Sequence, residues 1–336
     1  MNSFGRLFRI SLYGESHGGE LGVVVDGCPA GIPLSLADFA PDLEKRKAGT
    51  PGTTARREPD EPMIKSGLFN LRTSGAPILI SFNNRDIESD DYVALRDTPR
   101  PGHADFVARS KFGGFNDPRG GGHFSGRLSL VIVTAGVIAK KLLSPVTVNA
   151  GLIEAGGSTE IDNVIQAALR QGDSVGGIVE CRIARLPVGL GEPFFDSVES
   201  LISHIVFAIP GVKGIEFGSG FACAKMRGSQ CNDALVNKDG KTRSNHAGGI
   251  NGGISNGNNV VFRVAVKPPS SIKKEQDTIN LRNNRPAKIS VGGRHDACIA
   301  LRMPVIIEAA AAIVMADLML IEQRIPRITE EENEPG

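Results

Sequence analysis

The sequence predicts an α+β fold in which helices pack on antiparallel sheets. Helical and strand-like segments are interspersed along the 336 residues, without the regular βαβ rhythm of a doubly wound parallel sheet. The alternating apolar pattern at residues 260–267 is typical of an antiparallel strand. No strong linker divides the chain, so we expect one domain over residues 1–325 and a disordered acidic tail at 326–336.

The first elements are expected near the N-terminus. An apolar strand at residues 22–26 leads into the Pro/Gly-rich loop 27–33. Ser35 followed by Asp38 is a variant of the helix N-cap pattern, and basic residues before Gly49 suit the end of the same helix. These signals predict strand, loop and helix in that order.

The same order recurs in the second half of the chain. A strand at residues 177–184 precedes the Pro/Gly-rich loop 186–193 and a helix at 197–207. An internal duplication that packs as two symmetric halves explains this recurrence, and so does the independent occurrence of such common loops. Two mostly buried helices are expected at residues 126–143 and 305–324.

Composition excludes several classes of function. The net charge of +1 creates no global field that attracts polyanions, and the absence of Trp with only two Tyr leaves few platforms for base stacking. We therefore expect no nucleic-acid partner, and any anion site must be a local cluster. The apolar stretches are too short or too charged to span a bilayer, and no signal peptide is evident, so we expect a cytoplasmic protein without a membrane partner.

The cysteines indicate neither a disulfide framework nor a metal site. They are odd in number and form no C-x-x-C pair, so we expect buried free thiols and no bound metal. The five are Cys28, Cys181, Cys223, Cys231 and Cys298.

Three separate loops place histidine beside residues suited to proton transfer. His17 sits in a glycine-bracketed turn, His103 follows Pro-Gly, and His295 lies between an arginine and a carboxylate. Histidine titrates close to neutral pH, and glycine turns allow a ligand to approach the main chain. We expect His17 and His103 to be exposed to a cleft where they act as acid–base groups.

Arginines gather in the same glycine-rich segments. The planar guanidinium donates two parallel hydrogen bonds to phosphate or carboxylate, so such a set predicts an anionic ligand. For any single arginine, a solvated surface position or a structural ion pair is the alternative. The six are Arg46, Arg56, Arg57, Arg100, Arg127 and Arg294.

These same blocks carry a family resemblance. Residues 14–29, 120–129 and 294–308 each resemble one of the three signature regions of chorismate synthase. Further blocks that resemble the family, in the family's order, are 56–60, 100–105, 212–216, 227–230, 244–250 and 267–271. The match extends to about Arg324, and it implies a β-α-β sandwich with internal pseudo-symmetry.

The resemblance implies a carbon–oxygen lyase acting on phosphates. The family eliminates phosphate and the C6 hydrogen from 5-enolpyruvylshikimate 3-phosphate (EPSP) to give chorismate, the last common step of the shikimate pathway to aromatic amino acids. The reaction has no net redox change but requires reduced FMN. NADPH is implied only if the enzyme reduces its own flavin, and a homotetramer is the family's assembly.

Catalytic roles carry over by resemblance to three residues. His17 would stabilise charge on the reduced flavin, His103 would protonate the departing phosphate, and Asp296 would assist deprotonation at flavin N5. The residues alone leave another hypothesis open for Asp296, because an Asp at this place can cap the following helix. Substrate contacts carry over to Ser16, Arg46, Arg56, Arg57, Arg100 and Arg127. We expect the Arg127 fork to face substrate anions and not a structural partner.

Flavin contacts carry over to a larger set. They fall on His123, Phe124, Ser125, Asn245, Asn251, Gly252, Lys267, Pro268, Pro269, Ser270, Ser271 and Arg294, with a further contact at residues 210–211. The chain departs from the family where Pro-Gly at 210–211 replaces a common Asn-Ala, which leaves only backbone contacts there. The stretch 49–54 lacks a common arginine, which puts an NADPH or substrate contact there in doubt.

Other functions fit the sequence less well. Two G-x-S-x-G stretches, 14–18 and 253–257, match the serine hydrolase elbow, but strand-like runs follow where that elbow requires a helix. A non-enzymatic flavin-binding module does not explain why acid–base residues share loops with arginines. No P-loop motif is present in the sequence.

Overall fold

The computed structural model of the protein describes residues 2–54, 56, 58–86, 94–292, 295–326 and 328. Two predicted site residues, Arg57 and Arg294, lie outside the described residues. Nearly all of the predicted acidic tail lies outside them as well.

The first sheet is formed by the N-terminal quarter of the chain. Its strand order is β1-β2-β3-β7-β4, and each strand pairs antiparallel with its neighbours. The strands are β1 (Ser3–Phe4), β2 (Arg9–Gly14), β3 (Glu20–Asp26), β4 (Met63–Ile64) and β7 (Ile78–Asn83). Every second residue of β3 and β7 is a fully buried apolar side chain, so that one face of this sheet is buried against helices. These residues are Leu21, Val23 and Val25 of β3 and Ile78, Ile80 and Phe82 of β7.

The second sheet belongs to the C-terminal half. Its order is β10-β13-β9-β8, again with antiparallel neighbours. The strands are β8 (Thr147–Ala155), β9 (Gly177–Ala184), β10 (Val212–Phe217) and β13 (Val260–Val266). Buried Val260, Phe262, Val264 and Val266 alternate with half-buried residues along β13, as the sequence pattern predicts.

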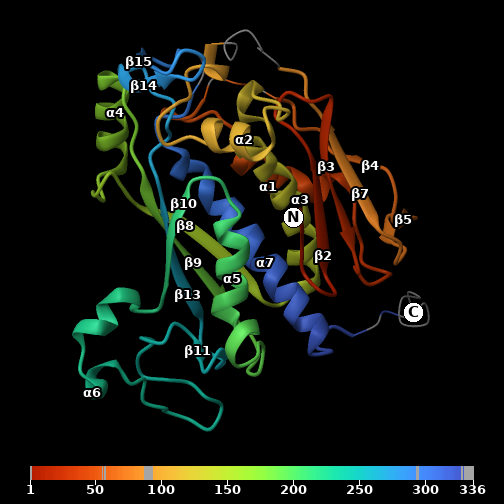
Figure 1. The fold of residues 1–336 in the computed structure, drawn as a ribbon. Helices are drawn as coiled ribbons and strands as arrows, with labels where there is room; N and C mark the ends of the chain where they lie inside the picture. Colours follow the sequence, from red (N-terminus) through yellow and green to blue (C-terminus); the bar gives the residue numbers. More distant parts are fainter. Residues whose placement is uncertain are drawn as a thin grey trace.

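Helices fill the space between the two sheets (Figure 1). The two central helices, α3 (Ser129–Leu143) and α7 (Met303–Ile321), pack on each other. Helix α3 also contacts β3 of the first sheet, and α7 contacts β8 and β9 of the second. Helices α1 (Ala40–Arg46) and α5 (Val198–Phe207) pack beside them. The result is a β-α-β sandwich, which confirms the predicted α+β class.

The two halves repeat one order of elements. In the first half, the hairpin β2–β3 is followed by α1, by β7 as the neighbour of β3, and by α3. In the second half, the antiparallel pair β8–β9, whose connection contains α4 (Ile161–Gln171), is followed by α5, by β13 as the neighbour of β9, and by α7. This shared strand order is the internal pseudo-symmetry that the family resemblance implies, and it favours duplication over independent occurrence of the loops.

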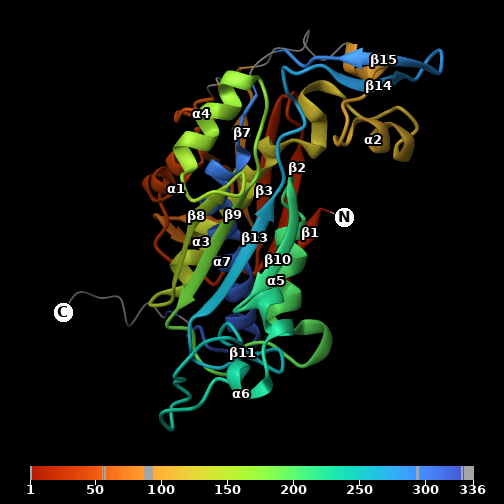
Figure 2. The same cartoon turned by 90° about the vertical axis from the view of Figure 1, so that its left-hand side faces the viewer.

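Smaller elements lie at the two ends of the sandwich (Figure 2). One end carries α2 (Asp105–Lys111) and the hairpin β14 (Gln276–Asn280) and β15 (Arg285–Ile289). The other end carries α6 (Gly228–Cys231) and the hairpin β11 (Ile250–Asn251) and β12 (Ile254–Ser255). The remaining regular elements are α4 (Ile161–Gln171), the hairpin β5 (Leu68–Phe69) and β6 (Arg72–Thr73), and short 3₁₀ turns.

One continuous hydrophobic core includes side chains of both sheets and of the central helices. Within the described part of the chain, a single helical stretch, Ile299–Ile321, is long and apolar enough to cross a membrane, but 83% of its apolar window is buried inside the molecule. Burial of this kind is the situation of a core helix in a globular protein. Two expected buried thiols, Cys223 and Cys231, are instead partly exposed, with their Sγ atoms 3.5 Å apart.

Candidate active site

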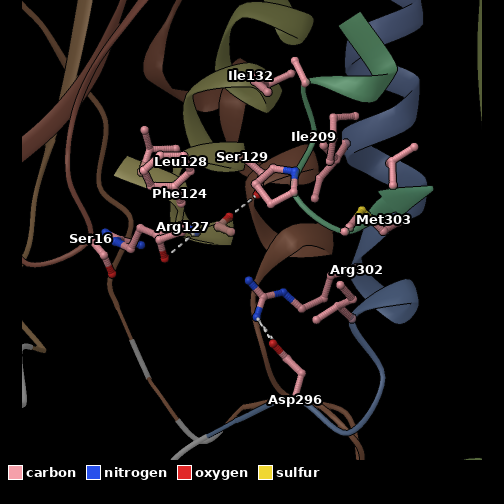
Figure 3. Close-up of a pocket in the computed structure, with 18 of the residues that line it drawn as sticks. Ser16, Phe124, Arg127, Leu128, Ser129, Ile132, Ile209, Asp296, Arg302 and Met303 are labelled. Atoms are coloured by element: carbon pink, nitrogen blue, oxygen red, sulfur yellow. Dashed lines mark hydrogen bonds and ion pairs between the residues drawn. The ribbon is translucent and has the colours of Figure 1, made fainter. Parts of the chain in front are cut away.

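A cavity of about 930 Å³ lies where α3 and α7 begin. Its wall includes Leu128 and Ser129 at the start of α3 and Met303 at the start of α7, as Figure 3 shows. Segments from both halves close the rest of the wall, among them the end of α5 and the residues after β13. Since the N-terminal end of a helix carries partial positive charge, two helices that begin here favour an anionic ligand.

Charged side chains on the wall are mostly basic. Among the described residues, eight basic side chains and three carboxylates line the cavity. The basic ones are Arg46, Lys47, Arg56, Arg100, Arg127, Lys213, Lys267 and Arg302, and the carboxylates are Glu58, Asp60 and Asp296. Because the whole chain has a net charge of only +1, this excess is the local cluster that an anion site requires.

Asp60 joins two of the predicted substrate arginines. Its carboxylate lies 2.6 Å from Nη1 of Arg127 and 3.1 Å from Nη1 of Arg46, and all three side chains are buried. Nε of Arg127 donates to Asn84 at 2.8 Å. The expectation that the Arg127 fork has no structural partner is therefore wrong, although Arg127 also lines the cavity.

The arginine cluster holds more positive charge than its carboxylates balance. Burial lowers the pKa of Arg46 to about 9, with a further lowering from the charges of Arg302 and Arg127 that Asp60 and Asp296 only partly oppose. A guanidinium whose protonated form is disfavoured in this way gains from an added negative charge. Binding of an anion in the cavity would supply that charge.

Ser16 and Arg56 form a second polar group on the wall. Arg56 donates through Nη1 to Oγ of Ser16 at 3.1 Å and through Nη2 to the Ser16 carbonyl at 3.2 Å. It also pairs with Glu58 at 2.7 Å. The structure thus places Ser16 and Arg56 at the cavity, as predicted.

His17 does not line the cavity, which corrects the expectation that its turn exposes it to a cleft. The side chain is only 5% exposed and lies behind the glycine-rich turn that precedes α3. A Cβ added at Gly120 would lie 2.2 Å from the His17 ring. Gly120 also has a φ of +57°, so glycine is required here for conformation and for space.

His103 does line the cavity, beside α2. Its Nδ1 lies 2.6 Å from the Asp105 carboxylate, and Arg100 donates to that carboxylate through both Nε and Nη2 at 2.8 Å. Nη1 of Arg100 donates to Ser271 at 2.9 Å. The fork of Arg100 is therefore occupied by protein partners, while its side chain still forms part of the wall.

Asp296 lies on the wall and does not cap a helix. Its carboxylate accepts a hydrogen bond from the Thr54 backbone N–H at 2.8 Å and pairs with Arg302 at 3.3 Å (Figure 3). The N-cap of the following 3₁₀ turn is Cys298. The capping hypothesis is therefore wrong.

Most of the predicted flavin contacts meet at the cavity. The residues that line it are His123, Phe124, Ser125, Lys267, Pro269, Ser270 and Ser271, together with Pro210 and Gly211. Nζ of Lys267 donates to Ser270 at 2.9 Å. Burial and the charge of Lys213 lower the pKa of Lys267, which marks this corner as another place where an anion is favoured.

Four predicted contacts do not line the cavity. Pro268 is not among the residues that line the cavity, although Lys267 and Pro269 on either side of it are. Asn245 donates to the Asn259 carbonyl at 2.9 Å, and Asn251 accepts from Asn256 at 2.7 Å. Asn251 and Gly252 belong to the β11–β12 hairpin at the end of the sandwich opposite α2 (Figure 2). Flavin contacts from Asn245, Asn251 and Gly252 are thus not part of this cavity within one chain.

Sequence reasoning missed several wall residues. Arg302 completes the cation cluster, and Glu58 and Asp60 balance it. Glu58 and Asp60 follow Arg56 by two and four residues in the block 56–60. This short spacing between opposite charges could have identified them as partners of the site arginines. Arg302 carries no signal of its own, since it stands in an apolar stretch. Among the described residues, no group of three or more His, Cys, Asp or Glu side chains could hold a metal ion.

Comparisons with a family model and with individual proteins point to one family. The family model for chorismate synthase matches residues 8–320. A chorismate synthase of Chitinophaga pinensis is 61% identical over 329 residues, covering 98% of this chain and 99% of that one. A chorismate synthase of Pyrococcus abyssi is 43% identical over 348 residues, covering 95% and 98%.

A solved structure agrees on the fold. A crystal structure of chorismate synthase superposes with a TM-score of 0.73 at 24% identity, covering 95% of this chain and 93% of that one. This likeness concerns the fold alone.

Proposed function

The chain belongs to the chorismate synthase family of lyases, and we propose that it converts EPSP to chorismate in the cavity at the start of α3 and α7. EPSP carries one phosphate and two carboxylates. The observation that supports the proposal most is the set of eight basic side chains that face only three carboxylates on the described wall. Guanidinium groups around a largely buried site bind such anions through paired, charge-assisted hydrogen bonds.

The residues present fit reduced FMN as the cofactor. Lys267, Ser270 and Ser271 offer an ammonium and two hydroxyl groups for the FMN phosphate, beside Lys213. Apolar side chains suited to a planar ring line the same cavity, namely Leu128, Ile132, Phe124, Ile209, Pro210, Met303 and Ile306. When bound, reduced FMN supplies an electron transiently to an elimination without net redox change.

The protein's own contribution is binding and proton transfer. Arg46, Arg56 and Arg127 hold substrate anions and exclude water from the reacting groups. His103 donates a proton from Nε2 to the departing phosphate, because its Nδ1 is occupied by Asp105. Asp296 would assist proton removal at flavin N5, and His17, whose ring lies behind Gly120, would stabilise negative charge on the reduced flavin.

Cellular location and assembly belong to the same proposal. We assign the protein to the cytoplasm and to a homotetramer, and NADPH enters only if the enzyme reduces its own flavin. Large exposed apolar side chains support an assembly, since Phe195 is 90% exposed and Phe221 is 83% exposed. Sedimentation analysis of the purified protein measures the oligomeric state.

An anaerobic assay tests the proposed activity. Purified protein is mixed with EPSP and chemically reduced FMN, and chorismate and phosphate are measured. The proposal predicts equal amounts of both products, and none when reduced FMN is omitted. Phosphate release without chorismate would reveal a phosphatase and contradict the proposal.

A further inference from the structure

Asp105 is the first residue of α2. Its carboxylate contacts His103 at Nδ1, the ring nitrogen opposite the one proposed to donate a proton to phosphate. Its Oδ1 lies 2.6 Å from Nδ1 of His103. The Asp105 side chain is 12% exposed and that of His103 is 23% exposed. This contact is short for a nitrogen–oxygen hydrogen bond and is protected from water, so it restricts the imidazole strongly.

Arg100 fixes the carboxylate in turn. Its Nε donates to Oδ2 of Asp105 and its Nη2 donates to Oδ1, both at 2.8 Å. The Asp105 carboxylate also accepts a hydrogen bond from the backbone N–H of Arg100 at 3.1 Å. Burial would raise the pKa of Asp105, but hydrogen bonds from Arg100 and His103 outweigh it and hold that pKa well below its usual range. Asp105 is therefore an ionised carboxylate that can only accept hydrogen bonds.

The position of one ring proton follows from these contacts. A carboxylate oxygen at 2.6 Å from Nδ1 requires a hydrogen between them, since otherwise two lone pairs would face each other. Nη2 of Arg100 also lies 3.0 Å from Nδ1, but it carries two hydrogens, one of which it donates to Oδ1, and neither of them can account for the 2.6 Å contact between Nδ1 and the carboxylate. The hydrogen on the short contact is thus carried by Nδ1 of His103.

We propose that Asp105 is a positioning residue that keeps Nδ1 of His103 protonated and stabilises the imidazolium, so that Nε2 alone exchanges a proton with the ligand in the cavity. This rests on the proposed function, in which His103 is the acid for the departing phosphate. The arrangement is the one by which a buried carboxylate orients a catalytic histidine in other enzymes.

Each proton that moves in this step can be accounted for. The N–H bond at Nε2 breaks, its proton forms an O–H bond on the departing phosphate, and the ring becomes neutral with Nδ1–H still bonded to Asp105. Solvent returns a proton to Nε2 after phosphate leaves. Asp105 remains ionised throughout. Arg100 then serves to hold Asp105, which explains why its fork is occupied by Asp105 and Ser271.

A double-mutant cycle tests the proposal. Single anaerobic turnovers with reduced FMN are measured for the wild type, Asp105→Asn, His103→Ala and the double variant. Asp105→Asn keeps the shape but removes the charge and can donate to Nδ1, so we expect turnover to fall by roughly 10² to 10⁴ with little change in the KM for EPSP. In the His103→Ala background, the same substitution should change turnover by about twofold at most, because its effect acts through His103.

Two further variants separate positioning from folding. Asp105→Glu keeps the carboxylate and should restore part of the lost turnover. Asp97→Asn removes a carboxylate from the same stretch, which pairs with Arg109 and Arg282 and not with His103, so its turnover should stay near the wild-type value. An equal loss from Asp105→Asn in both His103 backgrounds would show a merely structural role and overturn the proposal.

A spectroscopic readout is independent of activity. The ring nitrogens of His103 are observed by NMR in protein labelled with ¹⁵N-histidine, with His103→Ala for assignment among the six histidines. The neutral ring should carry its proton on Nδ1 in the wild type and shift toward Nε2 in Asp105→Asn. An unchanged tautomer would overturn the proposal, whereas an inactive wild type with the expected tautomer shift would overturn only the proposed function.

Discussion

At the scale of single residues, the arginines of the site differ in what they already bind. Arg127 is held by Asp60 and Asn84, Arg100 by Asp105 and Ser271, and Arg56 by Ser16 and Glu58. Their sequence context indicated an anion site but not these partners. The Asp60 contact forms only when the end of α1, the loop before β4 and the start of α3 meet, which is a tertiary event that no local pattern encodes.

Replacing Arg127 tests the structural part of its role. Arg127→Ala leaves buried Asp60 with Arg46 as its only remaining guanidinium partner among the described residues. Because truncating one partner of a buried ion pair strands the other charge, we expect a loss of about 3 kcal/mol in the free energy of unfolding. Chemical denaturation measures it.

Arg182 is the matched control. It forms a salt bridge with Glu180 on an exposed strand face, so Arg182→Ala should lower the unfolding free energy by less than about 1 kcal/mol. Equal stability of Arg127→Ala and wild type would mean that Arg127 serves the ligand only.

At the scale of elements, close packing of α3 on α7 places both helix starts at the cavity. Gly136 of α3 faces Ala309 of α7, and a Cβ on Gly136 would lie 2.3 Å from that of Ala309. Gly136→Ala must therefore push the helices apart, and we expect a loss of about 1 to 3 kcal/mol in unfolding free energy. Thermal and chemical denaturation measure this loss.

Gly151→Ala in β8 is the control, because there is open space around the new methyl group. It should have little effect on the unfolding free energy. A similar loss in both variants would argue against the packing explanation.

Lys140 links three helices by charge. Its Nζ lies 2.8 Å from Asp42 of α1 and 2.8 Å from Glu308 of α7. Lys140→Met leaves two largely buried carboxylates without this counter-charge, so we expect a loss of about 2 kcal/mol, a value reduced for the partial exposure of Lys140. Lys141→Met, which breaks a more exposed pair with Asp38, should lose less.

The Lys140 contribution has a defined pH dependence. Burial would lower the pKa of Lys140, but the charge of Glu308 and the hydrogen bonds to Asp42 and Glu308 outweigh it and raise that pKa above 10.5. A raised folded-state pKa stabilises the protein fully below the unfolded-state pKa of lysine, and this contribution disappears as pH rises through the folded-state value. The stability difference between wild type and Lys140→Met should therefore shrink in strongly alkaline solution; a constant difference would contradict this origin.

The elements that the sequence predicted well are those with strong local signals. Ser197 caps α5, whose bounds match the predicted helix within one residue, and β9 matches the predicted strand. The two-residue strands β4, β5 and β6 carried no such signal. Their conformation depends on partner strands and not on their own residues.

At the scale of the whole molecule, two similar halves form one site. The repeated order of antiparallel strand pair, helix, strand and long helix brings α3 and α7 together, and their N-terminal ends meet at the cavity. The recurring order of strand, loop and helix was visible in the sequence. Whether it reflects an internal duplication depended on which strands pair, and the sequence did not show the pairing. The same limit explains the misplaced contacts: the resemblance that assigned flavin contacts to Asn251 and Gly252 did not reveal that the β11–β12 hairpin lies at the end of the sandwich opposite α2.

The central claim is that flavin and substrate share this one cation-lined cavity. Titration of FMN fluorescence with purified protein, in the absence and presence of EPSP, tests it most directly. If the substrate covers the flavin within the cavity, the Kd for FMN should fall by about tenfold or more when EPSP is present, a coupling within the usual range for interacting ligands. Equal affinity with and without EPSP would contradict the claim.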